Sequence, residues 1–226
     1  YCIVTLSWVF FTLFGMLPFY LSGSIDSLTN AFFETMSGFT TTGATILDDI
    51  ESLSHGMLFW RSLTQWIGGL RIVFFTIAVL PAFTSGGVQL FSAESTGVIH
   101  DRTHPKINVM AKWLWTVYLI LTLAETILLM LGGMSLFDAV CQSFATTATG
   151  GYSTKQASIS YWNSPFIEYV VAIFMLLSGV NFALFLMCLR GKVSRLLRDE
   201  ELRWFLGSVA ILTFLITFAL VFQNHY

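Results

Sequence analysis

The fold of this chain can be argued from two strings, Thr40-Thr41-Thr42-Gly43-Ala44-Thr45 and Ala148-Thr149-Gly150-Gly151-Tyr152-Ser153. A semi-apolar segment precedes each string, at residues 27–37 and 135–145, and each segment starts with a serine. Segments of about ten residues are too short to cross a bilayer, and a serine at the start is typical of a helix N-cap. The pattern predicts two re-entrant half-helices, each ending at a glycine-containing turn.

The remainder of the chain is strongly apolar. Of 226 residues, 55% are hydrophobic and 11% are charged, and the mean hydropathy is +0.74. Soluble domains carry about 25% charged residues, so this composition argues against a soluble enzyme and for a multi-pass membrane protein. A net charge of −2 with eleven Lys and Arg also argues against a nucleic-acid partner, which requires a basic face.

Five apolar spans have the length of a membrane-crossing helix. They cover residues 1–21, 57–83, 113–131, 166–189 and 204–222. Since the chain opens on Tyr1 and runs at once into an uncharged span, we expect it to be a piece of a longer polypeptide.

An internal repeat relates the two halves at an offset of 108 residues. The order of span, half-helix, string and span occurs twice, which supports a true repeat. We therefore predict an all-α membrane protein in which this order of elements occurs twice. The predicted parts are a first repeat at 1–83, a linker at 84–110, a second repeat at 111–190, a linker at 191–203, and a last helix at 204–226. The matched residues include Ser27 with Ser135, Ala31 with Ala139, Thr41 with Thr149, and Gly43 with Gly151.

Charge placement predicts the orientation. Lysine and arginine gather in the linkers 84–110 and 191–203, which the positive-inside rule places in the cytoplasm. The opposite link, residues 22–56, holds five acidic residues and no Lys or Arg. The outer face is therefore expected to be acidic.

The strings have the chemistry of a cation site. Glycine permits positive φ, so successive carbonyls can turn toward one axis, and the C-terminal end of a half-helix carries about −0.5 charge. The string from Thr149 to Ser153 matches the K⁺-channel filter T-V-G-Y-G at three of five positions. The alternative is that both strings are ordinary turns.

Several longer stretches resemble the TrkH/KtrB family of bacterial K⁺-uptake membrane subunits, and the likeness is greatest to its TrkH branch. These stretches are residues 31–45, 65–69, 78–81, 150–154 and 175–184, which together sample almost the whole chain. The resemblance implies four repeats of the M1–half-helix–M2 type found in K⁺ channels, arranged around one pore. This chain would then hold two of them, at 1–83 and 111–190, and the first helix of a third repeat at 204–226. It also implies that backbone carbonyls bind K⁺ at Thr41, Thr42, Gly43, Ala44, Thr149, Gly150, Gly151 and Tyr152.

The resemblance further implies a partner set and a location. We expect a multi-pass protein of the bacterial inner membrane, with K⁺ as its cargo, no cofactor and no enzymatic activity. The expected partners are the lipid bilayer, the other two repeats of the same polypeptide, a second copy in a homodimer, and a cytosolic nucleotide-binding ring of the TrkA type.

Two polar residues are candidates for the inner pore. The family commonly has a glycine where this sequence has Arg71, and matching Gly69 to Gly179 places Arg71 opposite Asn181. Charged side chains within a membrane usually face a cavity or a partner. Arg71 could line the inner vestibule, pair with Glu125 or a backbone carbonyl, or be a local peculiarity.

The remaining polar residues have plainer interpretations. Arg61 is expected to snorkel to the outer interface, and Gly68 with Gly69 to allow close packing. Glu125 or Glu168 could bind the driving ion of an H⁺- or Na⁺-coupled symporter, although structural roles are favoured. His55 beside Ser54 offers a remote alternative, an intramembrane hydrolase, but no third orienting group accompanies the pair.

Overall fold

The computed structural model describes residues 2–70, 107–180, 184 and 199–223. Contacts divide the chain into two units, Tyr1–Gly179 and Val180–Tyr226. All regular elements among the described residues are helices, as predicted. In the first unit they are α1 (Cys2–Gly15), α2 (Leu17–Leu21), α3 (Leu28–Phe39), α4 (His55–Gly69), α7 (Ile107–Leu131), α8 (Leu136–Thr147), the 3₁₀ helix η1 (Ser158–Trp162) and α9 (Pro165–Gly179).

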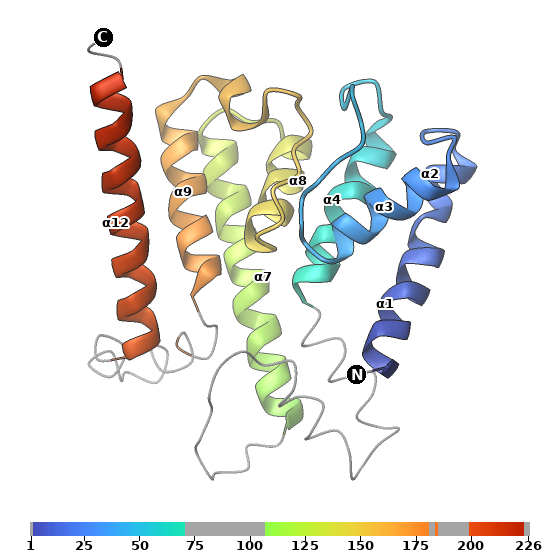
Figure 1. Cartoon of the computed structure of the whole chain (residues 1–226), viewed down its shortest axis with the longest axis horizontal. Coiled ribbons are helices and arrows are strands. Elements are labelled where there is room, and N and C mark those ends of the chain that lie inside the picture. The colour runs from blue at the N-terminus through green and yellow to red at the C-terminus, as the bar shows by residue number, and fades with distance from the viewer. Residues whose placement is uncertain (1, 71–106, 181–183, 185–198, 224–226) are drawn as a thin grey trace. The chain divides into compact units, whose positions relative to one another are not determined.

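The first unit contains the helix order that the sequence predicts, twice. In Figure 1, α1 and α7 run in one direction and α4 and α9 in the other. Between them, α3 and α8 each stop partway, and the chain then returns to the end from which it came. The two short helices correspond to the predicted half-helices, with bounds that differ by one or two residues.

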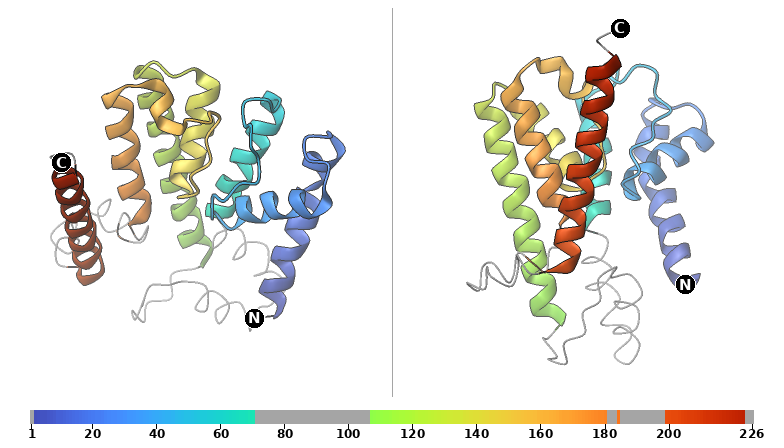
Figure 2. Two further views of the ribbon diagram at one scale, coloured as in Figure 1. Left: turned by 45° about the horizontal axis from the view of Figure 1, so that its top comes forward. Right: turned by 60° about the vertical axis from the view of Figure 1, so that its left-hand side comes forward.

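Helix α4 packs against both half-helices. It lies between α3 and α8 in Figure 1 and in the left view of Figure 2. A Cβ added at Gly68 would overlap the backbone of Phe39, at the end of α3. One added at Gly69 would lie 2.5 Å from the Tyr118 hydroxyl and 2.9 Å from Ala148 Cα, just after α8. The predicted close packing at this glycine pair is confirmed.

The predicted first span is interrupted. The structure divides it into α1 and α2 at Met16, where the sequence predicts one helix to Leu21. Pro18 lacks an N–H and cannot donate to the carbonyl four residues earlier, so an unbroken helix loses a hydrogen bond at this position. The Trp60 indole of α4 donates to the Gly15 carbonyl at 3.0 Å, which satisfies an acceptor at the break.

The two half-helices begin differently. Ser135 accepts a hydrogen bond from the Asp138 amide at 3.1 Å, the N-cap bond of α8, and its hydroxyl donates to Asp138 Oδ2 at 2.7 Å. Ser27 occupies the same N-cap position before α3, but its side chain makes no capping hydrogen bond.

Two described helices are long and apolar enough to cross a membrane, Lys112–Leu131 and Glu200–Phe222. The segments Thr5–Leu21 and Pro165–Gly179 are shorter apolar helices. The predicted spans 57–83 and 166–189 continue beyond the described residues. In the second unit, α12 (Glu200–Gln223) covers the predicted span 204–222, and its apolar side chains are exposed.

Candidate ion-binding site

Both half-helices end in the same backbone motif. After α3, the Thr41 amide donates to the Gly38 carbonyl at 3.0 Å and the Thr42 amide to Ser37 at 2.9 Å. After α8, the amides of the two matching residues make the same pair of bonds, at 2.9 and 2.8 Å. These two bonds define a Schellman motif, whose left-handed residue is usually glycine. Threonine occupies that position in both strings.

The sign of φ alternates along both strings. The φ angles are 54° at Thr41 and 76° at Gly43, and 56° at Thr149 and 87° at Gly151, whereas the residues between them have no positive φ. In an ordinary strand, successive peptide groups point to opposite sides, so alternating handedness brings their carbonyls to one side. A β-branched residue at positive φ is an outlier, and such strain clusters at functional sites.

The structure brings the two strings together. A Cβ added at Gly43 would overlap the carbonyl oxygen of Gly150 and would lie 3.8 Å from Gly151 Cα. Beyond this contact, the Tyr152 hydroxyl lies 3.3 Å from the Ala44 carbonyl. The eight predicted filter residues therefore form one continuous group. Of these eight, Thr42, Ala44, Thr149 and Gly151 are exposed, so the strings line an accessible surface.

On their buried side, which we call the back of the strings, side chains accept hydrogen bonds from backbone amides. Gln65 of α4, fully buried, accepts from the Tyr152 amide at 3.1 Å. Glu34 of α3 accepts from the Ile46 amide through Oε2 at 3.0 Å. A Cβ added at Gly150 would overlap the Gln65 side chain, which explains the glycine there. These bonds fix the direction of the Tyr152 amide in the second string and of the Ile46 amide just after the first string.

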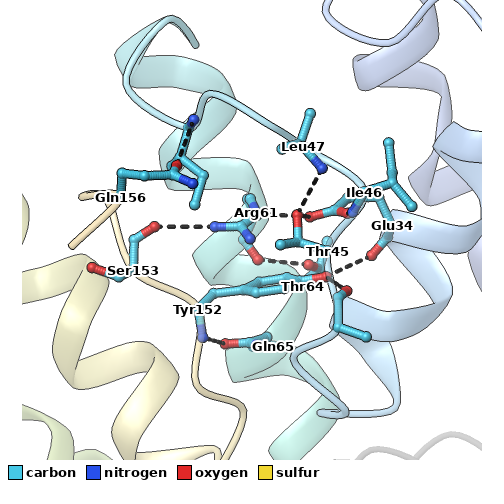
Figure 3. A network of polar contacts seen from close by, with 12 residues as sticks. Glu34, Thr45, Ile46, Leu47, Arg61, Thr64, Gln65, Tyr152, Ser153 and Gln156 are labelled. Carbon is cyan, nitrogen blue, oxygen red and sulfur yellow. Dashed lines mark hydrogen bonds and ion pairs between the residues drawn. The ribbon is translucent and has the colours of Figure 1, made fainter. Parts of the chain in front are cut away.

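Arg61 does not snorkel, so this prediction was wrong. Its side chain is 2% exposed, and its Nε donates to Glu34 Oε1 at 2.8 Å. A terminal guanidinium nitrogen donates to the Ser153 carbonyl at 3.0 Å, and the guanidinium lies 3.6 Å from the centre of the Tyr152 ring (Figure 3). An arginine with a buried carboxylate and a carbonyl as partners gains nothing by reaching the interface.

Tyr152 connects the two strings through its side chain as well as belonging to the second string. Its side chain is 1% exposed, and its hydroxyl donates to the Glu34 carbonyl at 2.9 Å. The ring of the second string therefore lies behind the first string (Figure 3). The aromatic residue of T-V-G-Y-G indicated that Tyr152 matters, but the sequence did not predict where its ring packs.

The loops beyond the strings are also joined. The Ile50 amide donates to Gln156 Oε1 at 3.2 Å, and Lys155 Nζ donates to Glu51 Oε2 at 3.3 Å. Slight desolvation lowers the pKa of Lys155, but the hydrogen bond and charge of Glu51 outweigh it and hold this pKa above its ordinary value. The two loops therefore meet at three places. Gly43 contacts Gly150, Ala44 contacts Tyr152, and Ile50 and Glu51 contact Gln156 and Lys155.

The other candidate residues stay apart from the strings or lie outside the described part. Arg71 and Asn181 lie outside the described residues. Glu125 is fully buried; Thr147 donates to its Oε2 at 3.4 Å, and its Oε1 has no partner among the described residues. Glu168 is exposed in the first turn of α9, where the helix dipole favours an acid.

The residues of the hydrolase alternative have structural roles. The Ser54 hydroxyl accepts from the Met57 amide at 3.4 Å as the N-cap of α4. The His55 ring packs against Phe137 at a centroid distance of 4.7 Å. A serine used as a helix cap and a histidine on a phenylalanine are not a nucleophile and its base.

Comparisons with known proteins agree on one family. The family model described as "TrkH: Cation transport protein" matches residues 1–223. The Trk system potassium uptake protein TrkH of Escherichia coli K12 is 44% identical over 229 residues, which are 100% of this chain and 47% of that protein. TrkG of the same strain is 37% identical over 91% of this chain and 43% of its own length.

A solved structure agrees as well. The crystal structure of the potassium transporter TrkH from Vibrio parahaemolyticus matches with a TM-score of 0.80 and 36% identity, over 99% of this chain and 45% of that one. The chain spans about half the length of the curated relatives that it matches. Those relatives are named as Trk system potassium uptake proteins. The chain belongs to the TrkH family of cation transport proteins.

Proposed function

We propose that this chain forms half of the pore of a K⁺-uptake channel. In this proposal, the carbonyls of residues 41–44 and 149–152 replace part of the hydration shell of K⁺. The observation that carries it is the alternating sign of φ in two strings that meet where Gly43 faces the Gly150 carbonyl. The amides held from behind by Gln65 and Glu34 support the same direction for the carbonyls.

Electrostatics favours a cation at this place. The C-terminal ends of α3 and α8 lead directly into the strings, and each contributes a partial charge of about −0.5. The membrane potential would drive inward movement with about 2.3 kcal/mol per charge per 100 mV. Thermodynamically, K⁺ uptake through such a path needs no second substrate.

The rest of the assembly follows as part of the proposal. Two further repeats of the same polypeptide would supply two more strings and close the pore, which suits relatives of about twice this length. We place the protein in the bacterial inner membrane as a multi-pass homodimer. The linkers 84–110 and 191–203 would face a cytosolic nucleotide-binding ring of the TrkA type, and their basic residues would suit that docking.

A second candidate is an ion-coupled K⁺ symporter. Glu125 favours it, since this carboxylate is fully buried in α7 and one of its oxygens has no partner among the described residues. A buried carboxylate of this kind could bind a proton or Na⁺ during transport.

Electrical recording from the full-length protein in giant liposomes separates the two. A channel predicts a zero-current potential that follows the K⁺ gradient, does not move with a pH gradient, and moves with a Na⁺ gradient only by as much as its K⁺ over Na⁺ permeability ratio requires. A symporter predicts a larger shift with one of those gradients, and that Glu125→Gln removes the shift. Absence of any K⁺ current or flux from the wild-type protein would contradict both.

A further inference from the structure

We propose that Arg61 is a positioning residue for ion discrimination, because it fastens the outer ends of both strings to one buried charge pair. This inference rests on the proposed function of the strings as a K⁺ filter. Arg61 lies on α4, its carboxylate partner Glu34 on α3, and its carbonyl partner Ser153 at the end of the second string. One side chain thus connects three segments.

Glu34 fixes the end of the first string. Its Oε1 accepts from the Thr45 hydroxyl at 3.0 Å as well as from Arg61, and its Oε2 accepts from the Ile46 amide. Both carboxylate oxygens are therefore used, and two of the three donors belong to the residues that directly follow Ala44. A shift of Glu34 would move the backbone that sets where the first string leaves the site.

Arg61 fixes the end of the second string. The donors of a guanidinium diverge in one rigid plane, so a bond to Glu34 on one side sets the direction of the bond to Ser153 on the other. The Ser153 carbonyl is occupied by this bond at 3.0 Å. Because this carbonyl is held toward Arg61, the carbonyls that we assign to an ion in the second string end at Tyr152.

Tyr152 completes the connection. Its ring lies under the guanidinium at 3.6 Å, and its hydroxyl bonds the Glu34 carbonyl. The Tyr152 side chain is therefore held between the Arg61 guanidinium and the Glu34 carbonyl of α3 (Figure 3). Loss of Arg61 would release the ring of the second string and the carboxylate of the first together.

Stability alone does not account for this pair. The side chains of Arg61 and Glu34 are 2% and 0% exposed. Desolvation of a buried pair roughly cancels the attraction between its charges, so a well-packed neutral pair is often as stable. What a neutral pair lacks is the fixed direction of the charged hydrogen bonds.

The pair is also absent from the matching place in the second repeat. Gln142 matches Glu34 at the offset of 108 residues. Val171 matches Arg61 when His55 of α4 is set on Pro165 of α9, the first residues of two helices of equal length. A half-helix of this kind therefore folds without the pair, and the charges serve the junction between strings.

The test is the K⁺ over Na⁺ permeability ratio of the full-length protein in giant liposomes, together with the amount of folded protein in the membrane. Arg61→Met alone leaves the buried Glu34 carboxylate without its positively charged partner, so we expect little folded protein. The double variant Glu34→Gln with Arg61→Met removes both charges and should restore that amount. Its permeability ratio should stay about fivefold below wild type, the scale of one ordinary hydrogen bond.

A conservative variant and a control sharpen the result. Arg61→Lys keeps the charge for Glu34, but a single ammonium cannot reproduce the fork to Ser153, so the ratio should fall while protein levels stay normal. Lys155→Gln breaks the exposed pair with Glu51 and should leave the ratio unchanged.

Each outcome decides something. A double variant that is folded and has the wild-type ratio overturns the proposal, because it assigns the pair a structural role only. If the double variant does not accumulate, Arg61→Lys decides, and a wild-type ratio there overturns the proposal equally. A wild-type protein without preference for K⁺ refutes the proposed filter itself, and the inference with it.

Discussion

The first and second strings have the same backbone and different surroundings. Both have a left-handed threonine at their second position and a left-handed glycine two residues later. Around the first, Gly43 abuts the Gly150 carbonyl, whereas a Cβ at Gly151 of the second would meet nothing within 4 Å. The left-handed turn therefore belongs to the end of each half-helix. The close contact at Gly43 arises only where the two strings meet.

The polar groups behind the strings differ in the same way. Behind the first, both oxygens of Glu34 are bonded. Behind the second, Gln142 Oε1 and Glu125 Oε1 have no partner among the described residues. A repeated backbone therefore does not require a repeated set of supporting side chains. Single substitutions at matching positions should have unequal effects in the two loops.

The largest difference is expected between Gly43→Ala and Gly151→Ala. Both place a side chain at positive φ, which costs about 1–2 kcal/mol. Only Gly43→Ala also forces a Cβ against the Gly150 carbonyl, and overpacking adds about 1–3 kcal/mol. K⁺ over Na⁺ discrimination of the full-length protein should fall at least about tenfold for Gly43→Ala and clearly less for Gly151→Ala.

Gly43→Ser should behave like Gly43→Ala, lowering discrimination more than it lowers expression. Equal losses at Gly43 and Gly151 would show that the left-handed backbone matters and the junction does not.

A smaller difference is expected at the glycine pair of α4. Gly68→Ala meets the backbone of Phe39 at the end of the first half-helix, and backbone cannot move aside cheaply. Gly69→Ala meets the Tyr118 hydroxyl, a side-chain atom, and approaches backbone less closely than Gly68→Ala does, at 2.9 Å from Ala148 Cα. We expect Gly68→Ala to cost about 2 kcal/mol and Gly69→Ala less.

Thermal unfolding of the purified protein in detergent measures both changes. Gly207→Ala is the control, since nothing lies within 4 Å of a Cβ there. A larger loss for Gly69→Ala would mean that α4 is fitted to the second loop more tightly than to the first.

The smallest difference is expected at the helix starts. Ser135→Ala removes the cap of α8 and should cost about 1 kcal/mol, the usual value for such a cap. Ser27→Ala should cost close to nothing, because Ser27 makes no side-chain capping bond. Unfolding of the two variants under identical conditions checks this, and equal stabilities would remove the asymmetry between the starts.

Much of this arrangement could be predicted from sequence because it depends on local chemistry. The half-helices follow from apolar length, a leading serine and a terminal glycine string. The interruption at Met16 was missed, because the first span was predicted as one helix, although Pro18 lacks the N–H that a continuous helix needs. The positive φ at Thr41 and Thr149 could not be predicted, because β-branched residues ordinarily avoid that region.

The supporting side chains could not be predicted, because they depend on distant partners. Arg61 is separated from Glu34 by 27 residues and from Ser153 by 92. A lone arginine near a helix end has snorkelling as its cheapest option until such partners are known. The position of the Tyr152 ring behind the first string is hidden for the same reason.

The central claim is that the two strings offer carbonyl oxygens to a dehydrated monovalent cation. Anomalous diffraction from crystals of the full-length protein in Rb⁺ tests it most directly, since Rb⁺ replaces K⁺ in carbonyl sites and its position can be located by its scattering. We predict a peak within coordination distance of the carbonyls of residues 41–44 and 149–152. A peak beside Glu125 with none at the strings would contradict the account.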